Sequence, residues 1–332
     1  MGRNYIEIDK DELKKKLKEL PTQNAVADFF NVSQGTISNK VRDYGLGAIM
    51  KPKTPKDKFH EMPDWDENEL KNLLYNLEDS SAKTIGYNEV DIEIETETPI
   101  EIASIADPHI GARHVEYRRF WKTVMDIRDI PNMFTTLNGD YADNYNTSAY
   151  KSGQIEQQLP IQKQKAIVEW FVKQLSPKTL SIINGCHDDW SYLNDGFDFA
   201  KYLAHKSRGY YLGHSGLINL KVGDVTYRIL VVHNTFRNST LNPGHGLRSV
   251  AKEGVDFDIG IGAHIHKPHF EQFVLRGELK TIMICGTFKL EDRHASKEGF
   301  PPLLSCTPGI ILNPKEFEVI GHIDYRKLVK YL

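Results

Sequence analysis

The chain has 332 residues, of which 40% are hydrophobic and 26% charged, with a formal net charge of −3. This composition is typical of an ordinary soluble protein. The three cysteines are odd in number and widely spaced, which argues against a disulfide framework and favours a reducing compartment. The sequence has neither an apolar run after Met1 nor a stretch of about 18 apolar residues. We therefore expect a cytoplasmic protein without membrane contact.

Charge is distributed unevenly along the chain. Residues 1–60 carry a net charge of +4, residues 61–100 one of −10, and residues 101–332 one of +3. An acidic connector thus separates a mildly basic head from a nearly neutral body. We predict a head at residues 1–50, an acidic linker with a short helix at 51–89, and a larger domain at 90–332.

The head has the pattern of three short helices. An amphipathic helix over about residues 10–20 comes first. Thr22 can cap a second helix, Asn31 can take the left-handed turn position, and Ser33 can cap a third helix. The pattern predicts a small all-α domain.

The segment Thr22 to Tyr44 resembles the helix-turn-helix of DNA-binding proteins and recombinase-like modules. The resemblance implies that its last helix is a recognition helix. It further implies DNA contacts from the exposed side of that helix, with Arg42 close to phosphate and the other contacts made by Gln34, Gly35, Ser38, Asn39 and Lys40. The alternative is a plain three-helix bundle that serves protein contacts.

From residue 90 onward, strand and helix patterns alternate. Predicted strands at 90–95, 100–105, 133–137 and 179–183 are interleaved with helices at about 116–130 and 161–175. Such alternation is typical of a largely parallel sheet. The second half is richer in strands, with a hairpin turn at Gly223-Asp224 and strands at 217–221, 226–232, 257–261, 270–275 and 281–284. We therefore expect two mixed sheets packed face to face with helices outside.

Five of these strands are followed by residues of the types that commonly bind metal ions, namely aspartate, histidine and cysteine. The residues are Asp107 and His109, Asp140 and Asp143, Cys186 to Asp188, His233, and His264 and His266. A single Asp or His in such a place is usually a capping residue. Five in order can converge on one crevice at a sheet edge, which predicts a metal site. His245 is the alternative to His233.

The motifs Asp107-x-His109, Gly139-Asp140-x-x-Asp143, Gly185-x-His187-Asp188, His233 and His264-x-His266 resemble those of the calcineurin-like metallophosphoesterase superfamily over about residues 100–325. The resemblance implies a four-layer α/β/β/α sandwich of two mixed sheets that holds two divalent metal ions. It implies that Asp140 bridges the ions, that Asp107, His109 and His266 bind the first, and that Cys186, His233 and His264 bind the second. Mn²⁺ is the expected ion, with Zn²⁺ or Fe²⁺ as alternatives.

The resemblance also assigns roles beside the metals. His187 is expected to protonate the leaving oxygen or to stabilise charge on the phosphate. Asp143 is its expected orienting partner, with Asp188 as the alternative. Cys186 stands where the family usually has asparagine; as a thiolate it would favour a softer ion such as zinc, and otherwise it is an inert cysteine. Lys289 follows a predicted strand and could reach a phosphate.

These features predict a metal-dependent phosphoesterase with a DNA-binding head. We expect phosphodiester hydrolysis in nucleic acid by a metal-activated water, as in the DNA-repair nuclease branch and the bacteriophage metallophosphoesterases that the chain resembles. One alternative is a phosphatase or nucleotide phosphodiesterase that acts on small molecules. Another is a DNA-binding regulator whose metal site has decayed at Cys186.

Overall fold

The structure is a computed structural model that describes residues 8–20, 22–46, 66–82, 87–146, 151–291, 297, 299 and 303–332. The chain divides into two compact units, residues 1–85 and 86–332. Much of the predicted linker, residues 51–65 and 83–86, lies outside the described residues. Among the residues that are described, no helix is both long and apolar enough to cross a membrane.

The first unit contains helices α1 (Lys10–Glu19), α2 (Gln23–Phe30), α3 (Gln34–Asp43) and α4 (Glu67–Ala82). The expected caps are confirmed, because Thr22 and Ser33 each accept a hydrogen bond at 3.2 Å from a backbone N–H of the helix that follows. Asn31 takes the left-handed conformation, with φ 51° and ψ 46°. Leu13 and Ile37 lie in the small core that α1, α2 and α3 share.

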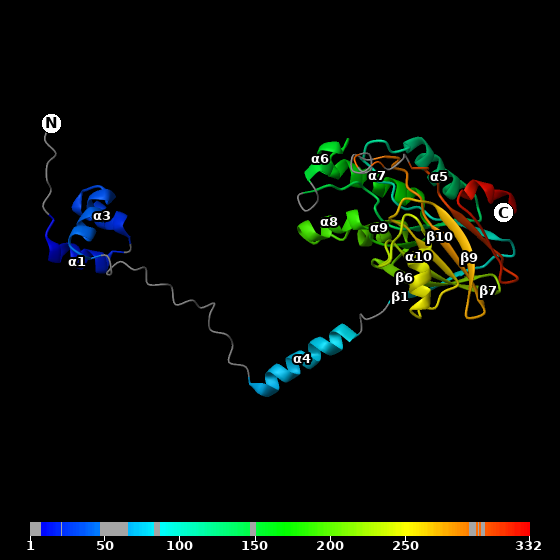
Figure 1. Ribbon diagram of the computed structural model, residues 1–332, viewed down its shortest axis with the longest axis horizontal. Coiled ribbons are helices and arrows are strands. Elements are labelled where there is room, and N and C mark those ends of the chain that lie inside the picture. The colour runs from blue at the N-terminus through cyan, green and yellow to red at the C-terminus, as the bar shows by residue number, and fades with distance from the viewer. Residues whose placement is uncertain are drawn as a thin grey trace. The chain divides into compact units, whose positions relative to one another are not determined.

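The second unit contains two six-stranded sheets (Figure 1). The first has the order β1-β6-β7-β8-β10-β9, formed by Asn88–Ile94, Ser215–Val222, Val225–Val232, Ile259–Gly262, Glu278–Ile284 and His269–Leu275. The second has the order β12-β11-β2-β3-β4-β5, formed by Val319–His322, Gly309–Leu312, Ile100–Ala103, Met133–Leu137, Thr179–Ile182 and Tyr210–Tyr211. Each sheet contains parallel and antiparallel pairs, so the prediction of two mixed sheets is confirmed.

Alternating side chains along the strands bind the layers together. In β2, Ile100 and Ile102 face the other sheet, and their apolar contacts lie in the core between the sheets. Ala103 faces the opposite way, into a core shared with helices α5 (Tyr117–Asp129), α7 (Ile161–Gln174) and α9 (Phe199–Ser207). Helix α10 (His245–Lys252) packs outside the first sheet. The result is a helix–sheet–sheet–helix order of layers (Figure 1).

Some strand pairs join segments that lie far apart in the sequence. β1 pairs in parallel with β6, more than 100 residues along the chain, so the alternating strand before the body is an edge of the first sheet. The pattern did not reveal β11 and β12, which extend the second sheet: β11 pairs antiparallel with β2, and β12 pairs antiparallel with β11. Both arrangements depend on partners far away in sequence, which local periodicity does not register.

Candidate metal centre

The predicted ligand residues come together where the two sheets present their parallel strand ends. β2, β3 and β4 are parallel neighbours in one sheet, and β7 and β8 are parallel neighbours in the other. Their carboxyl ends therefore deliver five loops to one edge of the sandwich. The loop after β4 leads into helix α8 (Cys186–Asp195), whose first residue is the predicted ligand Cys186.

Two groups of three residues have the spacing of metal ligands. In what we call the carboxylate half, Asp107, His109 and His266 place ligand atoms within 4.8 Å of one another. In the thiolate half, Cys186, His233 and His264 do the same. Two more groups share residues with these: Asp107, Asp140 and His233 join the halves, and His109, Asp140 and His187 include the predicted catalytic histidine. His245 is an exposed residue at the start of α10 and belongs to none of the groups found among the described residues.

The backbone of the ligand loops is unusual. Asp107, His109, Asp140, His264 and His266 all have positive φ, between 43° and 72°. This left-handed region is costly for residues other than glycine, and such residues concentrate at functional sites. Asp107 and His109 lie beyond β2, which ends at Ala103, and left-handed turns bring them to one site.

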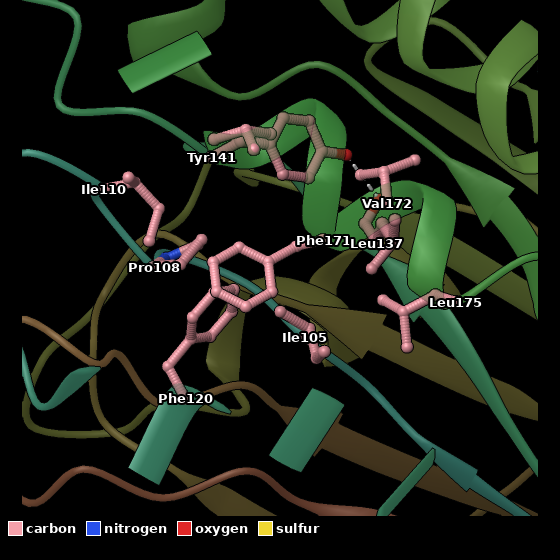
Figure 2. A pocket seen from close by; sticks show the side chains of 10 residues that line it. Ile105, Pro108, Ile110, Phe120, Leu137, Tyr141, Phe171, Val172 and Leu175 are labelled. Atoms are coloured by element: carbon pink, nitrogen blue, oxygen red, sulfur yellow. Dashed lines mark hydrogen bonds between the residues drawn. The ribbon is translucent and has the colours of Figure 1, made fainter. Parts of the chain in front are cut away.

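An apolar cavity lies on the other side of the same loops (Figure 2). Pro108 and Ile110, the sequence neighbours of His109, line it together with Phe120 of α5 and Phe171 of α7. Tyr141, next to Asp140, also lines it and donates hydrogen bonds to the carbonyl groups of Leu137 and Ile183. Polar ligands and apolar anchors therefore alternate along the loops, and packing against α5 and α7 supports the ligands from behind.

The distances within the site match those of a coordination shell. Metal bonds of about 2.0–2.1 Å to nitrogen and about 2.3 Å to sulfur, at tetrahedral angles, separate two nitrogen or oxygen ligands by about 3.3 Å and a sulfur from a nitrogen by about 3.6 Å. Cys186 Sγ lies 3.6 Å from His264 Nδ1, and Asp140 Oδ2 lies 3.3 Å from His233 Nε2. In the carboxylate half, His266 Nε2 lies 3.2 Å from both His109 Nε2 and Asp107 Oδ1.

Unpartnered polar atoms at the same place point to a cation. Asp107 Oδ1 and His233 Nε2 are buried and make no well-aligned hydrogen bond among the described residues, although each lies within 3.3 Å of another candidate ligand atom. Leaving such atoms unpaired costs about 1–3 kcal/mol each, more for a charged group. His233 Nδ1 lies 2.7 Å from the carbonyl oxygen of Asn138, which can only accept, so Nδ1 carries the proton and Nε2 of the neutral ring has the lone pair that a metal ion would need. The residues present therefore fit a divalent metal ion.

The electrostatics of the site also favour cations. Burial alone would raise the pKa of Asp140, but His233 and His187 beside it hold that pKa well below its usual value. Burial lowers the pKa of His109, helped by His187, so its ring is neutral, as a ligand requires. Burial opposes a charge on His233, yet Asp140 raises the pKa of this ring well above its usual value. A metal ion and a second proton on His233 exclude each other, so metal binding releases a proton there.

His187 is held beside the ligands. Its Nδ1 donates to the backbone carbonyl of Asp143 at 2.6 Å, and its backbone N–H donates to Asp140 Oδ1 at 2.7 Å. The Trp190 ring packs against its ring, with the centroids 4.0 Å apart. The Trp190 contact was not predicted, although the spacing of three residues on a helix places both side chains on one face.

The two predicted orienting carboxylates serve other contacts. Asp143 Oδ1 accepts a hydrogen bond from Lys289 Nζ at 3.1 Å and lies 3.6 Å from His109 Nδ1. Asp188 Oδ2 accepts hydrogen bonds from the backbone N–H groups of Asp140 and Gly185, at 2.8 and 2.9 Å. Burial, together with repulsion from Asp140, raises the pKa of Asp188 to about 7. Asp143 thus orients His187 through its carbonyl group, and Asp188 ties the β3 and β4 loops together.

The predicted DNA-binding residues lie on α3, in the first unit. Gln34, Ser38, Asn39 and Arg42 are exposed and Lys40 is half-buried, whereas Ile37 and Val41 of the same helix are buried. The Arg42 guanidinium donates to Asn39 Oδ1 at 3.2 Å, and Lys40 lies over the Tyr44 ring.

No protein-family model and no curated protein matches this chain. Among solved structures, Vps29 of Entamoeba histolytica is similar as a single mutant, with 14% identity and a TM-score of 0.39 over 67% of this chain and 91% of that one. Wild-type Vps29 of the same organism, complexed with Zn²⁺, gives 13% and 0.37 over 67% and 97%. The calcineurin-like phosphoesterase YfkN of Bacillus subtilis gives 11% and 0.36 over 69% and 91%.

Proposed function

We propose that this protein is a phosphoesterase whose second unit binds two divalent metal ions, and that it hydrolyses phosphodiester bonds in nucleic acid. One observation carries the proposal: the carboxylate half and the thiolate half lie side by side and are joined by Asp140. When bound in such a pair, divalent ions lower the pKa of a bound water and neutralise charge that develops on a phosphoryl group.

Three side chains have distinct roles around the proposed pair of metal ions. Asp140 lies between both halves and accepts the backbone N–H of His187, so it fixes the position of the catalytic histidine relative to the ligands. His187 carries a proton on Nδ1, held by the Asp143 carbonyl, and its Nε2 is the atom that exchanges a proton with the leaving oxygen. Trp190 covers the ring of His187 and restricts its orientation.

The nucleic-acid part of the proposal draws support from α3. Its buried residues, Ile37 and Val41, fix the helix in the small core and leave the polar residues Gln34, Ser38 and Asn39 exposed. An exposed polar helix with a basic last turn suits a major groove and its phosphates. The head would then bring the second unit to DNA.

Hydrolysis of bis-(p-nitrophenyl) phosphate by the purified protein with Mn²⁺ tests the chemistry. Asp140→Asn keeps the size of the side chain but removes its charge, and should reduce the rate to background. The exposed carboxylate Asp195 on α8 provides the control, because Asp195→Asn should leave the rate unchanged. A wild-type protein that is inert with every divalent ion would contradict the proposal and favour a DNA-binding regulator.

Labelled single- and double-stranded DNA test the substrate. We expect cleavage that depends on Mn²⁺ and weakens when Lys40 and Arg42 are both replaced by alanine. Activity confined to mononucleotide esters, and unaffected by these substitutions, would instead indicate a phosphatase or nucleotide phosphodiesterase for small molecules.

A further inference from the structure

We propose that the two halves of the centre select different ions, a soft ion such as Zn²⁺ in the thiolate half and a harder ion such as Mn²⁺ in the carboxylate half. The inference rests on the proposed metal centre but not on the substrate. Its first support is ligand chemistry. Thiolate and imidazole together suit zinc, whereas carboxylate ligands are also acceptable to manganese.

Cys186 is placed differently from the other cysteines. It is half-buried at the start of α8, whereas Cys285 and Cys306 are buried. Burial raises the pKa of Cys285 to about 12, and Asn138 Nδ2 and the Ser104 carbonyl lie within hydrogen-bonding distance of its sulfur. Cys285 is therefore the inert packing cysteine, and Cys186 is the one whose sulfur lies among metal ligands.

The geometry distinguishes the halves as well. The 3.6 Å between Cys186 Sγ and His264 Nδ1 is the sulfur–nitrogen edge of a tetrahedral zinc shell. In the carboxylate half, Asp107 Oδ1 and His109 Nε2 are 3.9 Å apart, which is wider than the tetrahedral edge of about 3.3 Å. A shell with more ligands and other angles accommodates that separation. One separation in the carboxylate half is thus wider than a tetrahedral zinc shell, although the two that involve His266, both 3.2 Å, match it.

Hydrogen bonds also fix the positions of the two histidines of the thiolate half. The Asn138 carbonyl holds the proton of His233 on Nδ1, which directs the unpartnered Nε2 to the cluster. The backbone N–H of His264 donates to Asp107 Oδ2 at 3.2 Å, which ties the thiolate half to a ligand of the other half. The two sites are therefore adjacent but differ in ligand type.

Metal binding, measured without turnover, tests the inference. Metal-stripped full-length protein is loaded with one equivalent of Co²⁺, and the thiolate-to-cobalt charge-transfer band is recorded in the near ultraviolet. Wild type and Cys306→Ser should show the band, and Cys186→Asn should lack it. With equal amounts of Zn²⁺ and Mn²⁺, wild type should retain one of each, and its Mn²⁺ should give the electron paramagnetic resonance spectrum of an isolated ion. In Cys186→Asn, zinc affinity should fall by about 100-fold or more, because even a lost supporting hydrogen bond costs 10–100-fold.

A measurement on wild type alone avoids any folding defect of the variant. X-ray absorption at the zinc edge should show one sulfur neighbour at about 2.3 Å. A shell of nitrogen and oxygen only, a charge-transfer band that survives in Cys186→Asn, or the spectrum of a spin-coupled manganese pair in the presence of zinc would each overturn the inference. A protein that shows the zinc–sulfur bond but hydrolyses no phosphoester would leave it standing and refute the proposed function.

Discussion

Glu101 offers a sharp test of the structure, because its carboxyl group is buried and forms no ion pair with the residues that the structure describes. It lies on β2, six residues before Asp107, and its side chain is fully buried. Neither carboxyl oxygen has a hydrogen-bond partner among the described residues. Burial, with additional repulsion from Asp324, raises its pKa from the usual 4.5 to about 8. The native state therefore holds a neutral carboxyl group here at neutral pH.

The sign of the pH dependence follows from proton binding. Between the unfolded and the folded pKa, the native state binds the proton that the unfolded state has lost, so the free energy of unfolding falls as pH rises. A pKa displaced by one corresponds to about 1.4 kcal/mol. Between pH 5 and pH 8, Glu101 should thus remove roughly 3 kcal/mol of stability, and most of the loss is complete near its folded pKa of about 8.

Glu101→Gln replaces the carboxyl group with a neutral group of the same shape. The difference in unfolding free energy between this variant and wild type should grow in favour of the variant by roughly 3 kcal/mol from pH 5 to pH 8. Urea unfolding followed by tryptophan fluorescence, at a series of pH values, measures it. The exposed Glu97 supplies the control, since Glu97→Gln should track wild type at every pH. Parallel pH profiles for Glu101→Gln and wild type would refute the burial argument.

Three further predictions concern the metal centre, the Lys289–Asp143 ion pair and the proposed DNA contacts. Removing metal with a chelator should lower the melting temperature by roughly 5–10 °C, and Mn²⁺ should restore it, since an ion present at 100 times its Kd contributes about 2.7 kcal/mol. A melting temperature that no divalent ion changes would exclude the metal centre. Lys289→Met should cost about 3 kcal/mol in urea unfolding, because it removes the ammonium that pairs with a buried carboxylate. Adding Asp143→Asn should recover part of that loss; additive losses would show that the pair is not coupled. Replacing both Lys40 and Arg42 by alanine should lower the slope of log affinity for DNA against log salt concentration by about 1 for each lost phosphate contact. Fluorescence anisotropy measures this slope, and the control variant Lys122→Ala should leave it unchanged.

Local features of the fold were accessible from sequence. The caps at Thr22 and Ser33 and the turn at Asn31 depend on side-chain oxygens and backbone conformations within a few residues, which leave a pattern in the chain. The strands of the second unit and the two mixed sheets followed from apolar periodicity in the same way. The five groups of candidate ligand residues after strand ends were recognisable, because parallel strands present their carboxyl ends at one edge of a sheet.

Tertiary structure decided which of these residues meet and how. It brought Cys186 beside His264, 78 positions away in the sequence, at the sulfur–nitrogen separation of a zinc shell. It placed Asp107 and His109 in left-handed backbone conformations that the sequence pattern does not predict. It also assigned the partner of Asp143, since the Lys289 ammonium reaches it from another loop. Sequence alone determined which chemical groups the chain carries at its strand ends. Distances, proton positions and unpaired atoms depend on contacts between remote segments, and only the folded chain creates those contacts.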